Sequence, residues 1–291
     1  MDKKINPAAL RELKEKLKEA GQNKLAGQLE YLFGFSPAKP SSKSATRADL
    51  LSLMDKFRKK AFEFDRLENK DGPTYFDILI SPVDFKTNIN PGTVREALEK
   101  TADIFSDSPV FYRPDTDSAP EWEDDRVYAY QNNPDGKKNL FGYWLFTFNT
   151  AALYVVHSTG ESIRERPEIF DPKIESCMIA DLLIAAGSLY KWMSFRPQQS
   201  IDMVLRYENA GGLSVGSLGE DYFLPSRKYQ DKSLSLYVVR PLYNLLGRTP
   251  EITADIILEL LKRMHYQGIV NRNYFLHAVA KHIGKDLKLS K

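Results

Sequence analysis

The longest helical pattern of hydrophobic positions runs from Asp171 to Trp192. Its apolar residues recur at steps of three and four, which places them on one broad face of a helix. Asp171 is suited to cap this helix, and Pro172 suits its first turn. Since most positions belong to the apolar face, the pattern predicts a mostly buried helix. The predicted core positions are Ile174, Met178, Ile179, Leu182, Leu183, Ala186, Leu189 and Tyr190, and the charged positions outside the face are Lys173, Glu175, Asp181 and Lys191.

Stretches typical of β-strands lie on both sides of this helix. The stretch 74–81 is largely apolar, as in the central strand of a sheet. The sequence Asn-Asn-Pro-Asp-Gly at 132–136 predicts a hairpin turn. These patterns predict an α+β fold, in which a mixed, largely antiparallel sheet packs on the central helix between N- and C-terminal helical units. The other strands are predicted at 126–131, 141–149, 151–157, 201–208 and 234–239.

Further helical patterns flank the strands. One covers 48–68, and another covers 93–105, where Thr93 and Glu96 have the spacing of a capping box. The stretch SPAKPSSKSATR, rich in Ser, Pro and Lys, is typical of a linker. Two short helical patterns, at 251–264 and 271–283, end the chain. The predicted parts are a helical hairpin at 1–36, a linker at 37–47, an α+β core at 48–245 and a basic helical unit at 246–291.

Charge is distributed unevenly along the 291 residues. The formal net charge of the whole chain is only +2, so the total indicates no nucleic-acid binding. Residues 1–70 hold 16 basic and 10 acidic residues, and residues 261–291 hold 7 basic and 1 acidic residue, a local +6 at each end. The stretch 103–125 is acidic. We therefore expect any contact with phosphates to involve only the ends of the chain.

The sequence shows no signal of secretion or membrane insertion. The N-terminus is polar, and no apolar run approaches ~18 residues without charge. The single cysteine, Cys177, lies on the predicted buried helix, where a core role is expected. It predicts neither an internal disulfide nor a thiolate metal site. We expect a cytoplasmic protein without membrane contact.

Motifs for catalysis are weak. The glycine-rich stretch 211–219 lacks the lysine of a phosphate-binding loop, and a flexible turn is the expected structure. The acidic run 121–125 lacks the spacing of a calcium loop. Asp77 and Asp84 with Lys86 approximate a nuclease metal site only loosely. We expect no catalytic residue, metal site or cofactor, and the alternative is a nucleic-acid-processing enzyme or nucleotide-binding effector that uses the acidic or glycine loop.

Basic side chains near both ends are the candidates for partner contact. The two C-terminal helical patterns and their tight turn have the layout of a helix-turn-helix, with aromatic residues between the basic ones. Basic side chains of this kind bind phosphates or acidic protein surfaces. The candidate contact residues are Lys14, Lys18, Lys24, Arg58, Lys59, Lys60, Arg263, Arg272, Lys281 and Lys285.

Several hydrophobic segments carry a resemblance to a known family. They are FDILISP at 76–82, Tyr143-Trp144, Ala152-Leu153-Tyr154, Glu161, the helix end Ala186-Gly187-Ser188-Leu189-Tyr190, the strand Ile201 to Arg206 and Gly212-Leu213. In this order they resemble the C-terminal region of large bacterial proteins whose N-terminal half is a Schlafen/AlbA-type DNA-binding domain. The AlbA-type half is missing here, so no functional residue is carried over. The resemblance implies a bacterial sensor or interaction module of regulatory or phage-defence systems.

The sequence as a whole favours a non-enzymatic intracellular sensor or adaptor. Such a protein would bind a protein or nucleic-acid partner through its basic helical ends, with the sheet as a scaffold. An aromatic content of 12% leaves open a structural subunit of a larger assembly, because the sequence does not separate a partner-binding aromatic patch from core.

Overall fold

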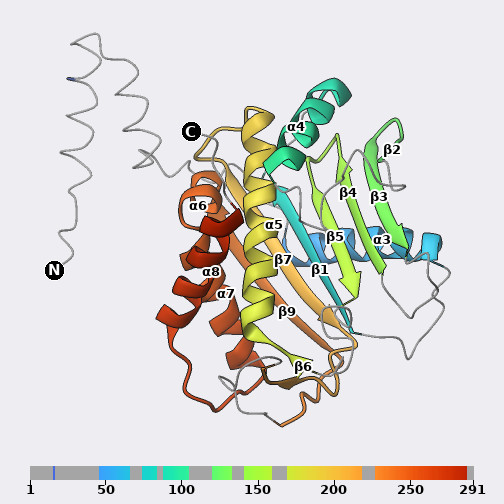
Figure 1. Cartoon of the computed structure of the whole chain (residues 1–291). Helices are drawn as coiled ribbons and strands as arrows, with labels where there is room; N and C mark the ends of the chain where they lie inside the picture. The colour runs from blue at the N-terminus through green and yellow to red at the C-terminus, as the bar shows by residue number, and fades with distance from the viewer. Residues whose placement is uncertain are drawn as a thin grey trace.

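The computed structural model describes residue 16 and residues 46–65, 74–83, 88–104, 120–132, 141–158, 169–217 and 227–286. Figure 1 shows a sheet with helices in front of it and helix α3 behind it, which confirms the predicted α+β class. The helices are α3 (Arg47–Asp65), α4 (Pro91–Ile104), α5 (Pro172–Trp192), α6 (Leu242–Gly247), α7 (Thr249–Arg263) and α8 (Arg272–Asp286). The strands are β1 (Tyr75–Pro82), β2 (Glu121–Trp122), β3 (Arg126–Asn132), β4 (Phe141–Thr147), β5 (Leu153–Ser158), β6 (Ile169–Phe170), β7 (Ser200–Glu208), β8 (Ser214–Val215) and β9 (Ser233–Pro241).

Seven strands form one sheet in the order β2-β3-β4-β5-β1-β7-β9. Every neighbouring pair in this sheet is antiparallel. β1 comes early in the chain but pairs with β5 on one side and β7 on the other. All of its residues are buried, as predicted for a central strand.

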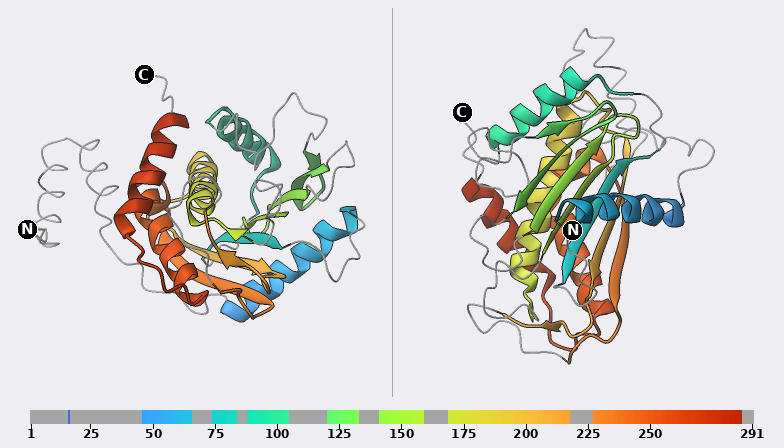
Figure 2. Two further views of the ribbon diagram at one scale, coloured as in Figure 1. Left: turned by 60° about the horizontal axis from the view of Figure 1, so that its bottom comes forward. Right: turned by 90° about the vertical axis from the view of Figure 1, so that its right-hand side faces the viewer.

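Different helices cover the two faces of the sheet (Figure 2). Alternate residues of a strand point to opposite faces. Phe76 and Ile78 of β1 therefore belong to one core cluster with Leu183 of α5. Leu79 belongs to a second cluster, which contains Met54 of α3. The sheet thus lies between α3 on one face and a layer formed by the other helices on the opposite face.

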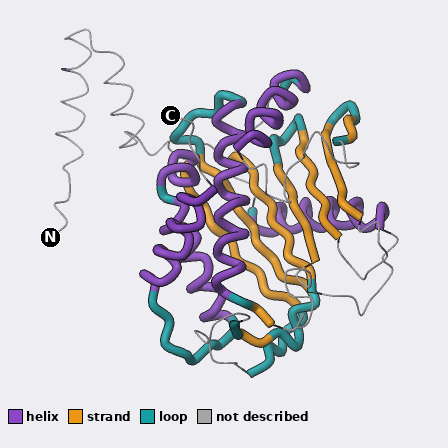
Figure 3. The backbone as a smooth tube through the Cα atoms, in the orientation of Figure 1, coloured by secondary structure: helices purple, strands orange, loops and turns teal. Residues whose placement is uncertain are grey.

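Helix α5 is the centre of that layer (Figure 3). The side chain of Asp171 accepts hydrogen bonds from the backbone amides of Lys173 and Ile174, which confirms the predicted N-cap. Helices α4, α6, α7 and α8 all contact α5. Ile256 of α7 and Phe275 of α8 lie in the same core cluster as α5.

The capping box predicted for α4 is wrong. The helix begins at Pro91, and Thr93 lies inside it. The side chain of Asn90 accepts a hydrogen bond from the amide of Gly92 at 2.7 Å, which makes Asn90 the capping residue. Because proline suits the first position of a helix and asparagine suits the cap, this pair places the start before Thr93.

The glycine-rich stretch, predicted as a turn, contains a short strand as well as a turn. Its described part, 211–217, contains β8, which pairs in parallel with β6. Gly212 has a φ of 98°, a conformation that glycine adopts without strain. A Cβ atom at Gly216 would lie 3.2 Å from a side-chain carbon of Ile169, so this glycine permits close packing against β6.

The C-terminal end of α5 is closed by a Schellman motif with an unusual residue. Ser194 has a φ of 63°, and its amide donates to the carbonyl of Lys191. The amide of Phe195 donates to the carbonyl of Tyr190, and the centres of the two aromatic rings are 5.2 Å apart. Glycine is usual at the left-handed position of this motif, because a side chain there costs ~1–2 kcal/mol.

Replacing Ser194 by glycine is expected to raise the free energy of unfolding by about 0.5–1 kcal/mol. Glycine removes the left-handed penalty, and its larger loss of backbone entropy cancels only part of the gain. Denaturation by urea measures the change. Ser52, which is exposed in the right-handed helix α3, is the control, because its glycine variant should be less stable. Equal losses of stability in both variants would contradict the prediction.

Candidate interaction surfaces

A buried carboxylate, Asp77 of β1, lies at the contact between α3 and the sheet. It is 0% exposed. Two guanidinium nitrogens of Arg206 on β7 lie 3.4 and 3.0 Å from the two carboxylate oxygens of Asp77. Nη2 of Arg58 on α3 lies 2.8 Å from Oδ1 of Asp77. The hydroxyl of Tyr154 donates to Oδ2 at 3.2 Å. Asp77 therefore faces two guanidinium groups and one phenol.

The ionic network continues from Asp77 towards the surface. Nη1 of Arg206 lies 2.5 Å from Oδ1 of Asp55, whose side chain is 64% exposed. Nη1 of Arg58 lies 3.4 Å from a carboxylate oxygen of Glu208. Burial, followed by the charge of Asp77, raises the pKa of Tyr154 well above its usual value, so this hydroxyl stays a hydrogen-bond donor.

Arg58 is therefore not the exposed contact residue that the sequence predicted. Its side chain is only 13% exposed, and it connects α3 to the sheet. Removing such a cation from water is costly unless carboxylates surround it, and here they do. Asp77 likewise faces arginines, which does not fit the nuclease site considered from the sequence, and Asp84 and Lys86 lie outside the described residues.

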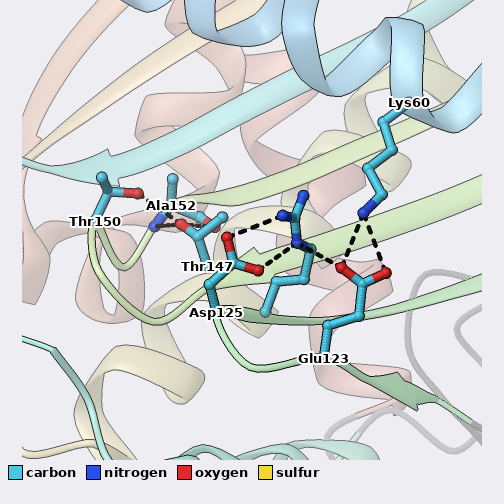
Figure 4. A network of polar contacts seen from close by, with 7 residues as sticks. Lys60, Glu123, Asp125, Thr147, Thr150 and Ala152 are labelled. Carbon is cyan, nitrogen blue, oxygen red and sulfur yellow. Dashed lines mark hydrogen bonds and ion pairs between the residues drawn. The ribbon is translucent and has the colours of Figure 1, made fainter.

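A second ionic network connects α3 to the turn between β2 and β3 (Figure 4). Nζ of Lys60 lies 3.0 and 3.2 Å from the two carboxylate oxygens of Glu123. Nε of Arg126 lies 2.9 Å from the same carboxylate, and the guanidinium of Arg126 also contacts Asp125 at 2.6 and 2.9 Å. Lys60, another predicted contact residue, is thus bound to a carboxylate of its own chain.

These pairs also account for most of the acidic run 121–125. Besides Glu123 and Asp125, Glu121 accepts a hydrogen bond from the hydroxyl of Tyr128 at 2.6 Å. In the described ranges, no group of three or more His, Cys, Asp or Glu side chains is arranged to hold a metal ion. The carboxylates of Glu121, Glu123 and Asp125 thus face cations and a phenol of the chain itself.

Two predicted contact residues of the C-terminal helices are also paired. Nε of Arg263 donates to Glu259 at 3.1 Å, and the same guanidinium donates to the backbone carbonyl of Ser235 on β9. Nε of Arg272 on α8 donates to Asp255 on α7 at 2.8 Å. β9 pairs only with β7 among the described strands, so Arg263 also occupies a backbone acceptor on the edge strand of the sheet.

The predicted cations that remain exposed lie on α3 and α8. Lys59 is exposed on α3, together with Lys56, which the sequence prediction did not include. Lys281 is exposed on α8. None of these three forms an ion pair with another described residue. Lys285 belongs to α8, but its side chain lies outside the described part of the chain, as do the N-terminal candidates Lys14, Lys18 and Lys24.

A buried glutamate–tyrosine pair on the other face of the sheet was not predicted from the sequence. Glu175 was placed outside the apolar face of α5, but it is only 5% exposed. Tyr207 of β7 donates a hydrogen bond of 2.7 Å to its carboxylate. Burial raises the pKa of Glu175 to about 7, the hydrogen bond from Tyr207 lowers it in part, and the charge of Asp171 raises it. The only sequence signal was the position of Glu175 one turn after the cap.

Comparison with protein-family models, curated proteins and solved structures found no match to this chain. The resemblance to the C-terminal region of Schlafen/AlbA-type proteins, and the bacterial regulatory or phage-defence setting that it implies, therefore stay predictions. None of the helices that the structure describes is long and apolar enough to cross a membrane.

Proposed function

We propose that this protein is a non-enzymatic adaptor that binds an acidic protein partner through the outer face of α3, with the sheet as its scaffold. The division of charge along α3 carries this proposal. Arg58 and Lys60 are paired with carboxylates of the sheet layer, whereas Lys56 and Lys59 are exposed without an ion pair to any described residue. A helix anchored in this way presents its outer cations from a rigid support.

A protein partner is favoured over a nucleic acid because so many predicted contact cations are already paired. Binding to a phosphate backbone draws its affinity from several cations that release counterions together. Among the predicted cations whose side chains the structure describes, Lys59 and Lys281 are exposed without an ion pair to a described residue, and they lie on helices that cover opposite faces of the sheet (Figure 2). The paired cations are Arg58, Lys60, Arg263 and Arg272.

The test reverses the outer charges of α3 in the full chain. A protein retained from host extract is identified, purified and titrated calorimetrically against the native chain and the double variant Lys56→Glu/Lys59→Glu. We expect the double variant to bind at least about tenfold more weakly, because like charges then face the acidic partner. The control, Lys228→Glu/Lys232→Glu, makes the same charge change at exposed positions outside α3 and should bind like the native chain.

Either of two results would overturn this proposal. One is a partner that binds all three forms with equal affinity. The other is tight binding of DNA or RNA that weakens steeply between about 50 and 200 mM salt, with a smaller salt dependence in the α3 variant. The second result would identify the outer face of α3 as a contact for phosphates.

A further inference from the structure

A large aromatic side chain is exposed at the end of the central helix. Trp192 is the last residue of α5, and it is 44% exposed. Among the described residues, the only other large hydrophobic side chains that are exposed are those of Val239 and Ile269. Exposed tryptophan is typical of the residues that contribute most to the affinity of protein interfaces. The Schellman motif that follows Trp192 holds its backbone in place.

One exposed cation lies over this tryptophan, and two others are close to it in the sequence. Nζ of Lys100 on α4 lies 4.6 Å from the centre of the Trp192 ring, where the C-terminal end of α5 lies beside α4 (Figure 1). Lys191 precedes Trp192, and Arg196 follows directly after the turn that closes the helix. All three cations are exposed, and none forms an ion pair with a described residue.

A purely structural role explains only part of this arrangement. Lys191 and Arg196 lie near the C-terminus of α5, where cations stabilise the helix dipole. The Lys100 ammonium is attracted by the electron-rich face of the ring. Neither effect requires the indole of Trp192 to remain accessible, and burying it would contribute more to folding.

We propose that Trp192, Lys100, Lys191 and Arg196 form a docking surface for an acidic peptide segment of a partner protein. The segment would carry a large apolar side chain next to Asp or Glu. Lys100 covers one face of the indole, so the apolar side chain packs on its remaining face and edge. The three cations receive the neighbouring carboxylates through charge-assisted hydrogen bonds.

The charges on α4 favour a peptide over a nucleic acid. Glu96 and Glu99 are exposed on the turn that precedes Lys100. A continuous phosphate backbone along this helix would meet both carboxylates, and such like-charge contacts weaken binding strongly. A peptide places its acidic side chains individually, so it can reach the cations and avoid Glu96 and Glu99.

This surface is separate from the one proposed on α3. Trp192 and Lys100 belong to the helical layer on one face of the sheet, and Lys56 and Lys59 lie on α3 against the other face (Figure 2). An adaptor with two surfaces on opposite sides can bind two partners at once. The docking surface does not depend on the α3 proposal, and substitutions test the two separately.

The experiment selects peptides with the full chain. A random peptide library displayed on phage is panned on the native chain, with removal of peptides that also bind the Trp192→Ala variant. We expect the selected peptides to carry an excess of Asp and Glu beside a large apolar residue. As synthetic peptides they should lose about 30-fold in affinity for Trp192→Ala and at least about tenfold for Lys191→Glu/Arg196→Glu, measured by fluorescence anisotropy.

Two controls separate this surface from others. Trp122 is the matched tryptophan, because the guanidinium carbon of Arg95 on α4 lies 4.8 Å from the centre of its ring. The Trp122→Ala variant should bind the peptides with an affinity within about twofold of that of the native chain. Lys56→Glu/Lys59→Glu should also retain binding. The Lys191→Glu/Arg196→Glu variant alters only exposed side chains, so it provides the test even if Trp192→Ala fails to fold.

The proposal fails if panning yields no peptide that binds the native chain and not the Trp192→Ala variant. It also fails if the selected peptides lack acidic residues. It also fails if single-stranded oligothymidylate binds the native chain and loses affinity in the same variants, since the surface would then recognise nucleic acid. Loss of peptide binding only in the α3 variant would place the contact on α3 instead.

Discussion

Replacing Asp77 by alanine is expected to lower the free energy of unfolding by about 3–5 kcal/mol. The substitution leaves the guanidinium groups of Arg58 and Arg206 without the fully buried carboxylate that they share. The side chains of these arginines are only 13% and 10% exposed, so water cannot readily replace the lost partner. Denaturation by urea, followed by circular dichroism, measures the loss.

Asp55 is the matched control within the same network. It contacts the same arginine, Arg206, but its side chain is 64% exposed. Exposed ion pairs contribute at most about 1 kcal/mol, so Asp55→Ala should cost far less than Asp77→Ala. Equal losses in the two variants would show that the burial of Asp77 does not determine the strength of this contact.

The second large effect concerns pH. Replacing Glu175 by glutamine is expected to make the protein more stable than the native chain by about 3 kcal/mol at pH 8, and to change stability little near pH 4.5. The pKa of the buried Glu175 carboxyl is raised from its ordinary value of 4.5 to about 7. Glutamine keeps an oxygen that accepts the hydrogen bond from Tyr207 and carries no charge.

The direction of this effect follows from proton binding. Between pH 4.5 and about 7 the folded state keeps the proton on Glu175 while the unfolded state releases it. The contribution of Glu175 to the free energy of unfolding therefore falls as the pH rises through this window. This loss is complete above about pH 7. Below pH 4.5 both states are protonated, and Glu175 contributes no pH dependence.

The measurement is the difference in unfolding free energy between Glu175→Gln and the native chain at several pH values from 4.5 to 8. Using the difference removes the contribution of other titrating groups. Glu96, which is exposed on α4, provides the control, because Glu96→Gln makes the same chemical change at a carboxyl that is not buried. A constant difference for Glu175→Gln would mean that its carboxyl titrates as it does in the unfolded chain.

The main elements of the fold were predictable because their signals are local. The three- and four-residue spacing from 174 to 190 predicted α5 and its buried face, and the largely apolar stretch 74–81 predicted the central strand β1. The short elements β2, β6, β8 and α6 were not predicted. Two-residue strands and a six-residue helix are too short to show a period.

The surfaces were much less predictable. Arg58 and Lys59 are neighbours with the same charge, yet the side chain of Arg58 packs against the buried Asp77 and that of Lys59 is exposed. About 100° separates adjacent residues around a helix, and only the packing of α3 decides which of them points inward. Trp192 was predicted as the end of α5, but no sequence pattern distinguished its exposed ring from the buried aromatic residues.

The sequence by itself determined the secondary structure that repeats with a regular period, the α+β class and the N-cap of α5. Only the tertiary structure decided which charges are buried and which are available to a partner. Asp77 and Arg206 are 129 positions apart, and Glu175 and Tyr207 are 32 apart. The physical reason is that a charge is neutralised, and a pKa is shifted, by the groups that the fold brings within a few ångströms. The periodicity of the chain contains no information about partners so distant in sequence.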